Sequence, residues 1–218
     1  MDLLAALLCA AIGYLCGCFL TADAVMRART GKHAFDVGSG NPGMANVGAQ
    51  LGPAWAALVL AGDILKTIFA VALAALVCAT IPDAGGLLKL LVACPGGIAF
   101  PHSGCLSTAC AGIGAVLGHD FPFWHGFSGG KGVAVTCTAV ILFNPPLGGL
   151  ACLIGLAVVV ASHKLGVAAL LIVCAFTLEM VIVAAPAEVL AFAIVLAVLA
   201  AASWYRGRVG SRNNGTKK

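Results

Sequence analysis

Seven stretches of apolar residues make up most of this chain, and they constrain its fold more than any other feature. Only 9% of the 218 residues are charged and 61% are hydrophobic, whereas soluble domains carry about 25% charged residues. An apolar stretch of about 20 residues is long enough for a helix to cross a bilayer. We therefore predict an all-α integral membrane protein with seven transmembrane helices, some of them short or broken. The predicted spans are residues 3–20, 55–80, 107–117, 133–143, 147–161, 167–184 and 189–203.

The polar segments between these spans are too short to fold alone, so the sequence predicts a single domain over residues 1–218. Positive charge predicts the orientation, because Lys and Arg are enriched in cytoplasmic loops. With the N-terminus outside and the C-terminus in the cytoplasm, ten of the 12 Lys and Arg residues fall on the cytoplasmic side. These ten are Arg27, Arg29, Lys32, Lys131, Lys164, Arg206, Arg208, Arg212, Lys217 and Lys218. An irregular outer segment, residues 82–104, is expected to hold a short interfacial helix over residues 87–94.

A pair of opposite charges lies within the second predicted span. Asp63 and Lys66 are three residues apart, which places them on one face of a helix. A charge at mid-bilayer costs about 2.5–3.5 kcal/mol, and pairing inside the protein offsets much of that cost. Two interpretations stay open: a functional site, or a pair that locks the helices together.

A glycine-rich loop with one lysine separates the third and fourth spans. It begins with Gly-His-Asp-Phe-Pro at residues 118–122 and ends with Ser-Gly-Gly-Lys-Gly at residues 128–132. Glycines let backbone N–H groups approach a ligand, and successive inward-facing amides form a nest for an anion, to which Lys131 adds a positive charge. The loop therefore predicts a phosphate cradle. It is not a Walker A loop, because His125 and Gly132 stand where that pattern needs Gly and Ser or Thr. The alternative is a flexible turn with a snorkelling lysine.

The loop after the first span ends in a run rich in Gly, Pro and Asn at residues 35–48. This composition predicts that the run forms neither a transmembrane nor an amphipathic helix. Ser39, Asn41 and Asn46 supply donors and acceptors that suit hydroxyls and phosphate oxygens. The alternative is an ordinary linker.

Both glycine-rich loops, the turn at Ser162 and the C-terminal tail are predicted to share the cytoplasmic face. Polar segments that meet at one membrane surface favour a site where a phosphorylated, water-borne ligand meets a lipid-soluble one. We predict no metal and no organic cofactor, because the chain has no CxxC pair and no other cluster of ligand residues.

Three motifs, in this order, resemble the bacterial PlsY family of acyl-phosphate:glycerol-3-phosphate acyltransferases. They are Gly-Ser-Gly-Asn-Pro-Gly at residues 38–43 with Asn-Val at 46–47, Gly-Asp-Ile-Leu-Lys at residues 62–66, and the stretch from residue 118 to Gly-Gly-Lys-Gly-Val at residues 129–133. The resemblance covers most of the chain. It implies an enzyme that transfers a fatty acyl group from acyl phosphate to the 1-hydroxyl of glycerol 3-phosphate, giving lysophosphatidic acid in phospholipid biosynthesis. It also implies a multi-pass monomer in the bacterial inner membrane. Such a protein would contact membrane lipids and no nucleic acid, with its active site on the cytoplasmic face.

The resemblance also implies roles for individual residues. Ser39 and Lys131 match the family's catalytic serine and loop lysine, which orient and neutralise phosphate. Substrate-binding residues are expected at Gly40, Asn41, Asn46, His119, Gly129, Gly130, Gly132, Ser162 and Arg206. None of the five histidines has an Asp five positions on, so the dyad of another acyltransferase superfamily is absent. We hypothesise that a substrate phosphate serves as the base.

Five positions depart from the family pattern. Ala45 and Ala49 replace a threonine and an arginine in the first motif, and Tyr205, Arg208 and Lys217 replace a histidine, an asparagine and a glutamate in the tail.

An alanine cannot supply the bidentate hydrogen bonds of a guanidinium group to phosphate. Either Arg206, Arg208 or Arg27 takes over that contact, or activity is reduced. Two alternative functions follow. One is a paralogue that binds glycerol 3-phosphate or lipid phosphate without turnover. The other, from a different class, is a small transporter of a phosphorylated solute, which the broken spans and the intramembrane charges would suit.

Overall fold

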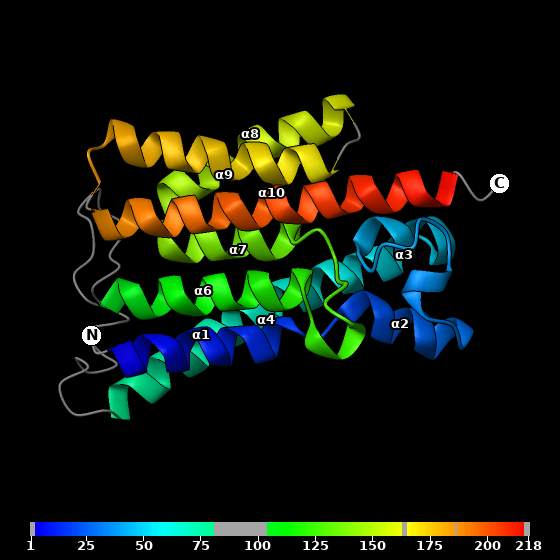
Figure 1. Ribbon diagram of the computed structural model, residues 1–218, viewed down its shortest axis with the longest axis horizontal. Helices are drawn as coiled ribbons and strands as arrows, with labels where there is room; N and C mark the ends of the chain where they lie inside the picture. Colours follow the sequence, from blue (N-terminus) through cyan, green and yellow to red (C-terminus); the bar gives the residue numbers. More distant parts are fainter. Residues whose placement is uncertain (1–2, 81–103, 163–164, 186, 216–218) are drawn as a thin grey trace.

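The computed structural model describes residues 3–80, 104–162, 165–185 and 187–215, which form helices joined by loops. A helix lies at each of the seven predicted spans, although the first ends three residues and the sixth two residues before the predicted end, and in Figure 1 these helices run side by side along the long axis of the molecule. They are α1 (Leu3–Gly17), α4 (Pro53–Thr80), α6 (Gly104–Asp120), α7 (Val133–Phe143), α8 (Pro145–Ser162), α9 (Leu165–Ile182) and α10 (Ala187–Gly215). The all-helical prediction is therefore confirmed for the described residues.

Five described segments are long and apolar enough to cross a membrane, judged by length and composition. They are Leu4–Thr30, Pro53–Val77, Pro145–Ser162, Leu165–Ile182 and Val189–Arg206. α7 is apolar but has only 11 residues. The number of crossings and the orientation of the two termini stay predictions. The helix expected over residues 87–94 lies outside the described residues.

A second short helix, α2 (Thr21–Thr30), follows α1 after a break at residues 18–20. It carries Arg27 and Arg29 in its last turn and is capped by Gly31, whose φ of 71° is left-handed. Glycine suits this position because it reaches positive φ at little steric cost. The polar residues after the first span are therefore partly helical.

The prediction of no helix within residues 35–48 was wrong, because α3 (Met44–Leu51) begins inside this run. The carbonyl oxygen of Gly43 accepts hydrogen bonds from the N–H groups of Asn46 and Val47, which starts the first turn. Met44, Val47 and Leu51 are spaced at intervals of three and four residues, so they share a face. That face packs with residues of α2 and α4, and tertiary burial therefore outweighs the low helix propensity of the run.

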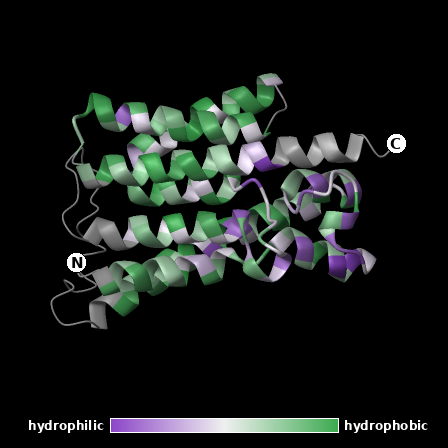
Figure 2. Ribbon diagram, in the orientation of Figure 1, coloured by the Kyte–Doolittle hydropathy of each residue, from purple (hydrophilic) through white to green (hydrophobic). Residues whose placement is uncertain are grey.

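Hydrophilic residues gather at one end of the molecule, where α2, α3 and the loop of residues 121–132 lie (Figure 2). α8 ends, α9 begins and α10 ends at this same end of the bundle (Figure 1). The structure thus brings together the polar segments that the sequence predicts on one face. α6 runs as far as Asp120, so residues 118–120 form the last turn of a helix and do not belong to the loop.

α1 and α6 are in close contact through glycines on both helices. A Cβ on Gly13 or Gly17 would overlap the carbonyl groups of Ala111 or Ala115, and a Cβ on Gly114 or Gly118 would overlap α1 backbone. Each helix thus has two glycines four residues apart, the spacing that lets transmembrane backbones approach closely. This packing fixes the end of α6 from which the glycine-rich loop departs.

Three phenylalanines hold the opposite side of the bundle together. The rings of Phe143 from α7 and Phe192 from α10 stack with centroids 4.4 Å apart, and Phe176 from α9 lies 6.3 Å from each of them, edge-on. All three side chains are buried in the main apolar core. The core therefore positions α7, which carries Lys131 and Gly132 just before its first turn.

Candidate active site

Asn46 organises the first glycine-rich loop from inside. Its amide nitrogen donates to the carbonyl oxygens of Ala34 (3.0 Å) and Val37 (2.9 Å), and its Oδ1 accepts from the N–H of Ser39 (2.9 Å). The residue is only 3% exposed. Asn46 was predicted to bind substrate, but these hydrogen bonds stabilise the loop that presents Ser39 and Asn41.

The second loop folds back on the end of α6. The N–H groups of Gly129 and Gly130 donate to the carbonyl oxygens of Asp120 and His119, each at 3.0 Å. The sequence predicts an anion nest of successive amides in this loop, and these two N–H groups are not available for it because both are paired with α6. The two glycines serve close packing instead, since a Cβ on either would overlap atoms of His119.

Two aromatic side chains tie the beginning of this loop to the first helix. The hydroxyl of Tyr14 donates to the carbonyl oxygen of Phe121 at 2.9 Å, and Nε1 of Trp124 donates to that of Cys18 at 3.1 Å. The loop is therefore held at its start by α1 and near its end by the last turn of α6.

Arg206 of α10 clamps the same loop from the other side. Its guanidinium donates to the carbonyl oxygens of Asp120, Phe127 (3.0 Å) and Gly130 (3.1 Å) and lies 4.4 Å from the ring centroid of Phe121. Predicted to bind substrate, Arg206 makes its described contacts with the loop, and it does not line the cavity described below. Its position fits a residue that fixes Lys131 in place through the loop.

A cluster of buried charged and polar side chains lies beneath the loop. Nζ of Lys66 is 2.8 Å from Oδ1 of Asp63, 2.9 Å from the carbonyl oxygen of Phe19 and 2.7 Å from Nδ1 of His119. Thr21 donates to Oδ1 of Asp63 at 3.2 Å. The predicted Asp63–Lys66 pair is confirmed, and it joins α4 to the last turn of α6 through His119.

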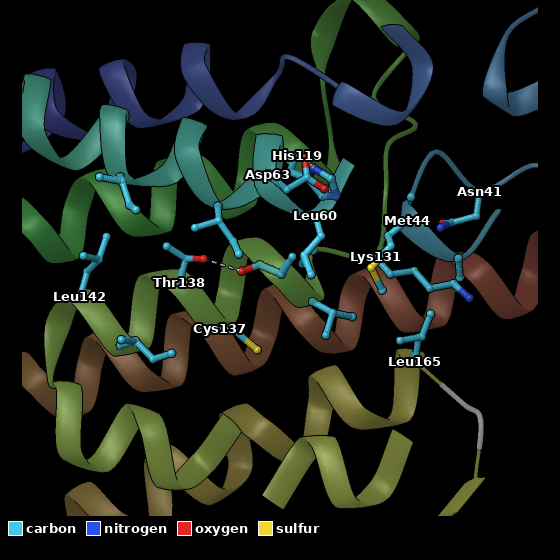
Figure 3. A pocket seen from close by; sticks show the side chains of 18 residues that line it. Asn41, Met44, Leu60, Asp63, His119, Lys131, Cys137, Thr138, Leu142 and Leu165 are labelled. Atoms are coloured by element: carbon cyan, nitrogen blue, oxygen red, sulfur yellow. Dashed lines mark hydrogen bonds and ion pairs between the residues drawn. The ribbon is translucent and has the colours of Figure 1, made fainter. Parts of the chain in front are cut away.

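A cavity of about 390 Å³ opens beside this cluster, between α4, α7 and the two loops. Figure 3 shows Asn41 and Lys131 at one end and Leu142 at the other. Asp63 and His119 line the polar part, while Leu60, Ile64, Ile68, Val133, Ala134, Cys137, Ile141 and Leu142 are among the residues that line the apolar part. Between residues 133 and 142 α7 rises by about 14 Å. The cavity therefore suits a long apolar chain with an anionic head.

Four predicted site residues line the cavity: Asn41, His119, Lys131 and Gly132. The side chain of Lys131 is exposed, as a residue that meets a water-borne anion should be. Ser39 is also exposed, and its hydroxyl accepts a hydrogen bond from the N–H of Asn41 at 3.4 Å. It lies next to the wall but is not part of it.

Two other predicted residues, Gly40 and Ser162, are also absent from the cavity wall. Gly40 adopts a left-handed φ of 68° in the first loop. The hydroxyl of Ser162 donates to the carbonyl oxygen of Val158 at 2.7 Å within α8. Neither residue lines the cavity.

The departures from the family pattern fall in different places. Ala45 lines the cavity and Ala49 is exposed one turn later on α3. Tyr205 is 66% exposed. Arg27 does not line the cavity, and the side chains of Arg208 and Lys217 lie outside the described residues. Apart from His119, Lys131 is the only basic residue in the described cavity wall.

The apolar cavity wall formed by α4 and α7 was not predicted from the sequence. The brevity of the apolar run 133–143 was a signal, because a helix this short leaves part of the bilayer thickness to be filled by something else. The contact between Lys66 and His119 was not predicted either, because 53 residues separate the two in the sequence. No group of three or more His, Cys, Asp or Glu residues suited to a metal ion occurs in the part of the chain that the structure describes.

Comparison with known proteins adds three findings. A family model described as glycerol-3-phosphate acyltransferase matches residues 7–211. The chain is 36% identical to glycerol-3-phosphate acyltransferase 1 of Lactobacillus johnsonii over 77% of this chain and 70% of that protein. It is 31% identical to the glycerol-3-phosphate acyltransferase of a Thermoanaerobacter species over 89% of this chain and 86% of that protein.

The fold is also similar to a solved structure. The crystal structure of PlsY, an integral membrane glycerol 3-phosphate acyltransferase, in its glycerol 3-phosphate form superposes with a TM-score of 0.72. The sequences are 25% identical, and the match covers 96% of this chain and 92% of that one.

Proposed function

This chain belongs to the glycerol-3-phosphate acyltransferase family, the PlsY family, and is therefore an acyltransferase; we propose that it transfers a fatty acyl group from acyl phosphate to the 1-hydroxyl of glycerol 3-phosphate. The product would be lysophosphatidic acid.

The observation that carries this proposal is the shape of the cavity. One end holds Lys131 and Asn41, and the wall then becomes apolar along α4 and α7 as far as Leu142 (Figure 3). A fatty acyl phosphate has this same division into an anionic head and a long apolar chain. The polar end is formed by exposed loops, so glycerol 3-phosphate can reach it from water.

The reaction forms a bond between the 1-hydroxyl oxygen and the acyl carbon, and it breaks the bond from that carbon to the phosphate oxygen. Acyl phosphate is already activated, so the protein must mainly position two anions and stabilise charge on the departing phosphate. Lys131 would neutralise phosphate, and Ser39 and Asn41 would orient it. The carboxylate of Asp63 is paired with Lys66 and accepts from Thr21. We therefore propose that the hydroxyl proton passes to a substrate phosphate.

The remaining predicted residues would act through the loops. Asn46 would hold Ser39 and Asn41 in position, whereas Gly129, Gly130 and Arg206 would place Lys131. Gly132, with a left-handed φ of 64°, would let α7 begin directly at the cavity.

We also propose that the loop end of the bundle faces the cytoplasm of a bacterial cell and that the protein acts as a monomer among lipids of the inner membrane. The described basic residues support this orientation, because Arg27, Arg29 and Lys32 lie at or just after the end of α2, beside the loops.

Acyl transfer by the purified protein in a lipidic medium tests the function. Palmitoyl phosphate and labelled glycerol 3-phosphate are expected to give lysophosphatidic acid, and Lys131→Ala is expected to lower the rate by about 100-fold, the effect of removing a group that stabilises developing charge. Lys32→Ala, an exposed lysine outside the cavity, serves as the control. Absence of product from the folded wild-type protein would refute the proposal.

One observation favours a second candidate, a weakened relative that binds glycerol 3-phosphate with little turnover. Ala45 and Ala49 leave α3 without a guanidinium beside the cavity. Binding of labelled glycerol 3-phosphate without lysophosphatidic acid formation would favour this candidate.

A further inference from the structure

One buried cluster of side chains lies beneath the polar end of the cavity and has no role in the acyl transfer described above. We infer that Lys66 is a positioning residue of this site. By donating a hydrogen bond to Nδ1 of His119, it fixes the imidazole with its proton on Nε2, where the ring presents a donor to an oxygen of a phosphorylated substrate. The identity of that ligand rests on the proposed function, whereas the position of the ring proton does not.

The ammonium group of Lys66 is fully used within the protein. It has three protons, and three acceptors surround it at 2.7–2.9 Å: Oδ1 of Asp63, the carbonyl oxygen of Phe19 and Nδ1 of His119. The side chains of Lys66 and Asp63 are only 7% and 6% exposed. Lys66 therefore has no proton left for a ligand, and its effect on the site passes through His119.

The protonation of the cluster follows from its charges. A buried carboxylate requires a cation beside it, and the nearest one to Asp63 is Lys66. A protonated lysine can only donate, so Nδ1 of His119 must accept and the ring proton must lie on Nε2. The charged groups around His119 come from three helices. Asp63 and Lys66 of α4 face the ring, the guanidinium of Arg206 on α10 is a further nearby positive charge, and Asp120 is the next residue on α6. A charged imidazole would place a second cation 2.7 Å from Lys66.

The Nε2 edge of the ring is the edge left for a ligand. Among the residues that the structure describes, Nε2 has no hydrogen-bond partner. This edge packs against Gly130, where a Cβ would overlap Nε2, so only a residue without a side chain fits beside it. His119 lines the cavity together with Lys131, the residue after Gly130. The donor on Nε2 and the ammonium of Lys131 therefore serve the same polar end.

A double-mutant cycle tests whether Lys66 acts through the imidazole. The variant Asp63→Asn with Lys66→Met removes both charges together, which avoids leaving one buried ion unpaired. His119→Gln keeps an N–H donor near the Nε2 position in a group that has no tautomers. We expect the paired substitution to lower kcat/KM about 10-fold or more when His119 is present, and less than about twofold in the His119→Gln protein.

Equal losses in the two backgrounds, or no loss with His119 present, would overturn the inference, because a purely structural role would not depend on the ring. The separate KM values for palmitoyl phosphate and glycerol 3-phosphate show which phosphate receives the hydrogen bond. Glu179→Gln on α9 is the matched control, since it replaces a carboxyl group within another candidate span outside the cavity.

Nitrogen NMR of the full-length protein labelled at histidine tests the tautomer without any assay of turnover. The His119 signals are those lost in His119→Gln. In the wild type we expect an unprotonated Nδ1 and a protonated Nε2, and in the paired variant a mixture of tautomers. A proton on Nδ1 in the wild type, or an unchanged spectrum in the paired variant, would refute the role of Lys66. An inactive wild type with the expected spectrum would refute the proposed function alone.

Discussion

The imidazole of His119 occupies the space that a side chain at position 130 would need, because a Cβ on Gly130 would overlap Nε2. The same two residues are joined through their backbones, where the N–H of Gly130 donates to the carbonyl oxygen of His119 at 3.0 Å. The last turn of α6 and the lysine loop are thus held in one fixed arrangement.

Gly130→Ala is therefore expected to lower acyl transfer by about 10-fold or more, because even small displacements of a positioning loop are costly. The added methyl group must push the loop or the ring aside, which moves Lys131. Initial rates and thermal stability of the purified variant measure the effect. In the His119→Ala background the overlapping ring is gone, so adding Gly130→Ala should not lower the stability further, while activity stays low. A Gly130→Ala protein with full activity would contradict this account.

Arg206→Lys is expected to loosen the lysine loop while preserving the charge. An ammonium cannot reproduce the guanidinium's planar fork of donors, which here reaches Asp120, Phe127 and Gly130. Each lost hydrogen bond to a charged donor is worth about 1.5–3 kcal/mol, so the melting temperature should fall and kcat should fall with it. Arg29→Lys, at the end of α2, is the matched control because it makes the same exchange away from the loop. An unchanged melting temperature and kcat for Arg206→Lys would show that these three hydrogen bonds are unimportant.

Ala49→Arg is expected to lower the KM for glycerol 3-phosphate several-fold. Residue 49 lies one turn after the cavity-lining Ala45, so a guanidinium there can reach the polar end. It would add a bidentate phosphate contact to a wall whose only described cation is Lys131. Gln50→Arg adds the same charge about 100° further around the helix and should change KM less. A KM that is lowered equally by both variants would indicate general electrostatic attraction.

Ile68→Trp is expected to raise the KM for palmitoyl phosphate and leave that for glycerol 3-phosphate unchanged. Ile68 lines the apolar part of the cavity on α4, so a larger ring would take up space needed by the acyl chain. Leu65→Trp on the same helix is the control, because Leu65 is 63% exposed and does not line the cavity. Shorter acyl phosphates should be affected less by Ile68→Trp. An effect confined to glycerol 3-phosphate would place the acyl chain elsewhere.

Gly114→Leu is expected to destabilise the protein by several kcal/mol, at the high end for single substitutions. A Cβ on Gly114 would overlap the carbonyl oxygen of Ala10, and the interface between α1 and α6 would have to separate. Thermal unfolding in detergent measures the change. Gly149→Leu on α8 has nothing within 4 Å of its Cβ position and should have little effect. Comparable stability of the two variants would mean that close helix contact is dispensable.

Much of the candidate site follows from residue type alone. Lys131 with its glycines, and Ser39 with Asn41, stand out because polar, glycine-rich runs cannot form membrane-spanning helices and must lie at a surface. Positive charge then predicts that both runs share one face. The structure does bring them to one end of the bundle (Figure 2).

The sequence did not show which of those residues face the cavity and which hold the loops in place. Asn46 and Arg206 are the same residue types as ligand-binding groups, yet their hydrogen bonds go to the loops. The amides of Gly129 and Gly130 are paired with α6 and do not form the expected nest. The sequence does not show whether a hydrogen-bonding side chain will contact a ligand or a backbone carbonyl, because that depends on the folded structure.

The sequence by itself determined that this chain is helical and apolar enough for a membrane, because few charges and long apolar runs leave the backbone no other way to satisfy its hydrogen bonds in lipid. It also predicted which short polar runs contribute to the candidate site, and four of the predicted residues line the cavity. Tertiary structure alone decided that Lys66 meets His119 across 53 residues and that α4 and α7 enclose an apolar groove. Such contacts depend on how helices pack, and packing is set by the shapes of whole helix surfaces and not by any local motif.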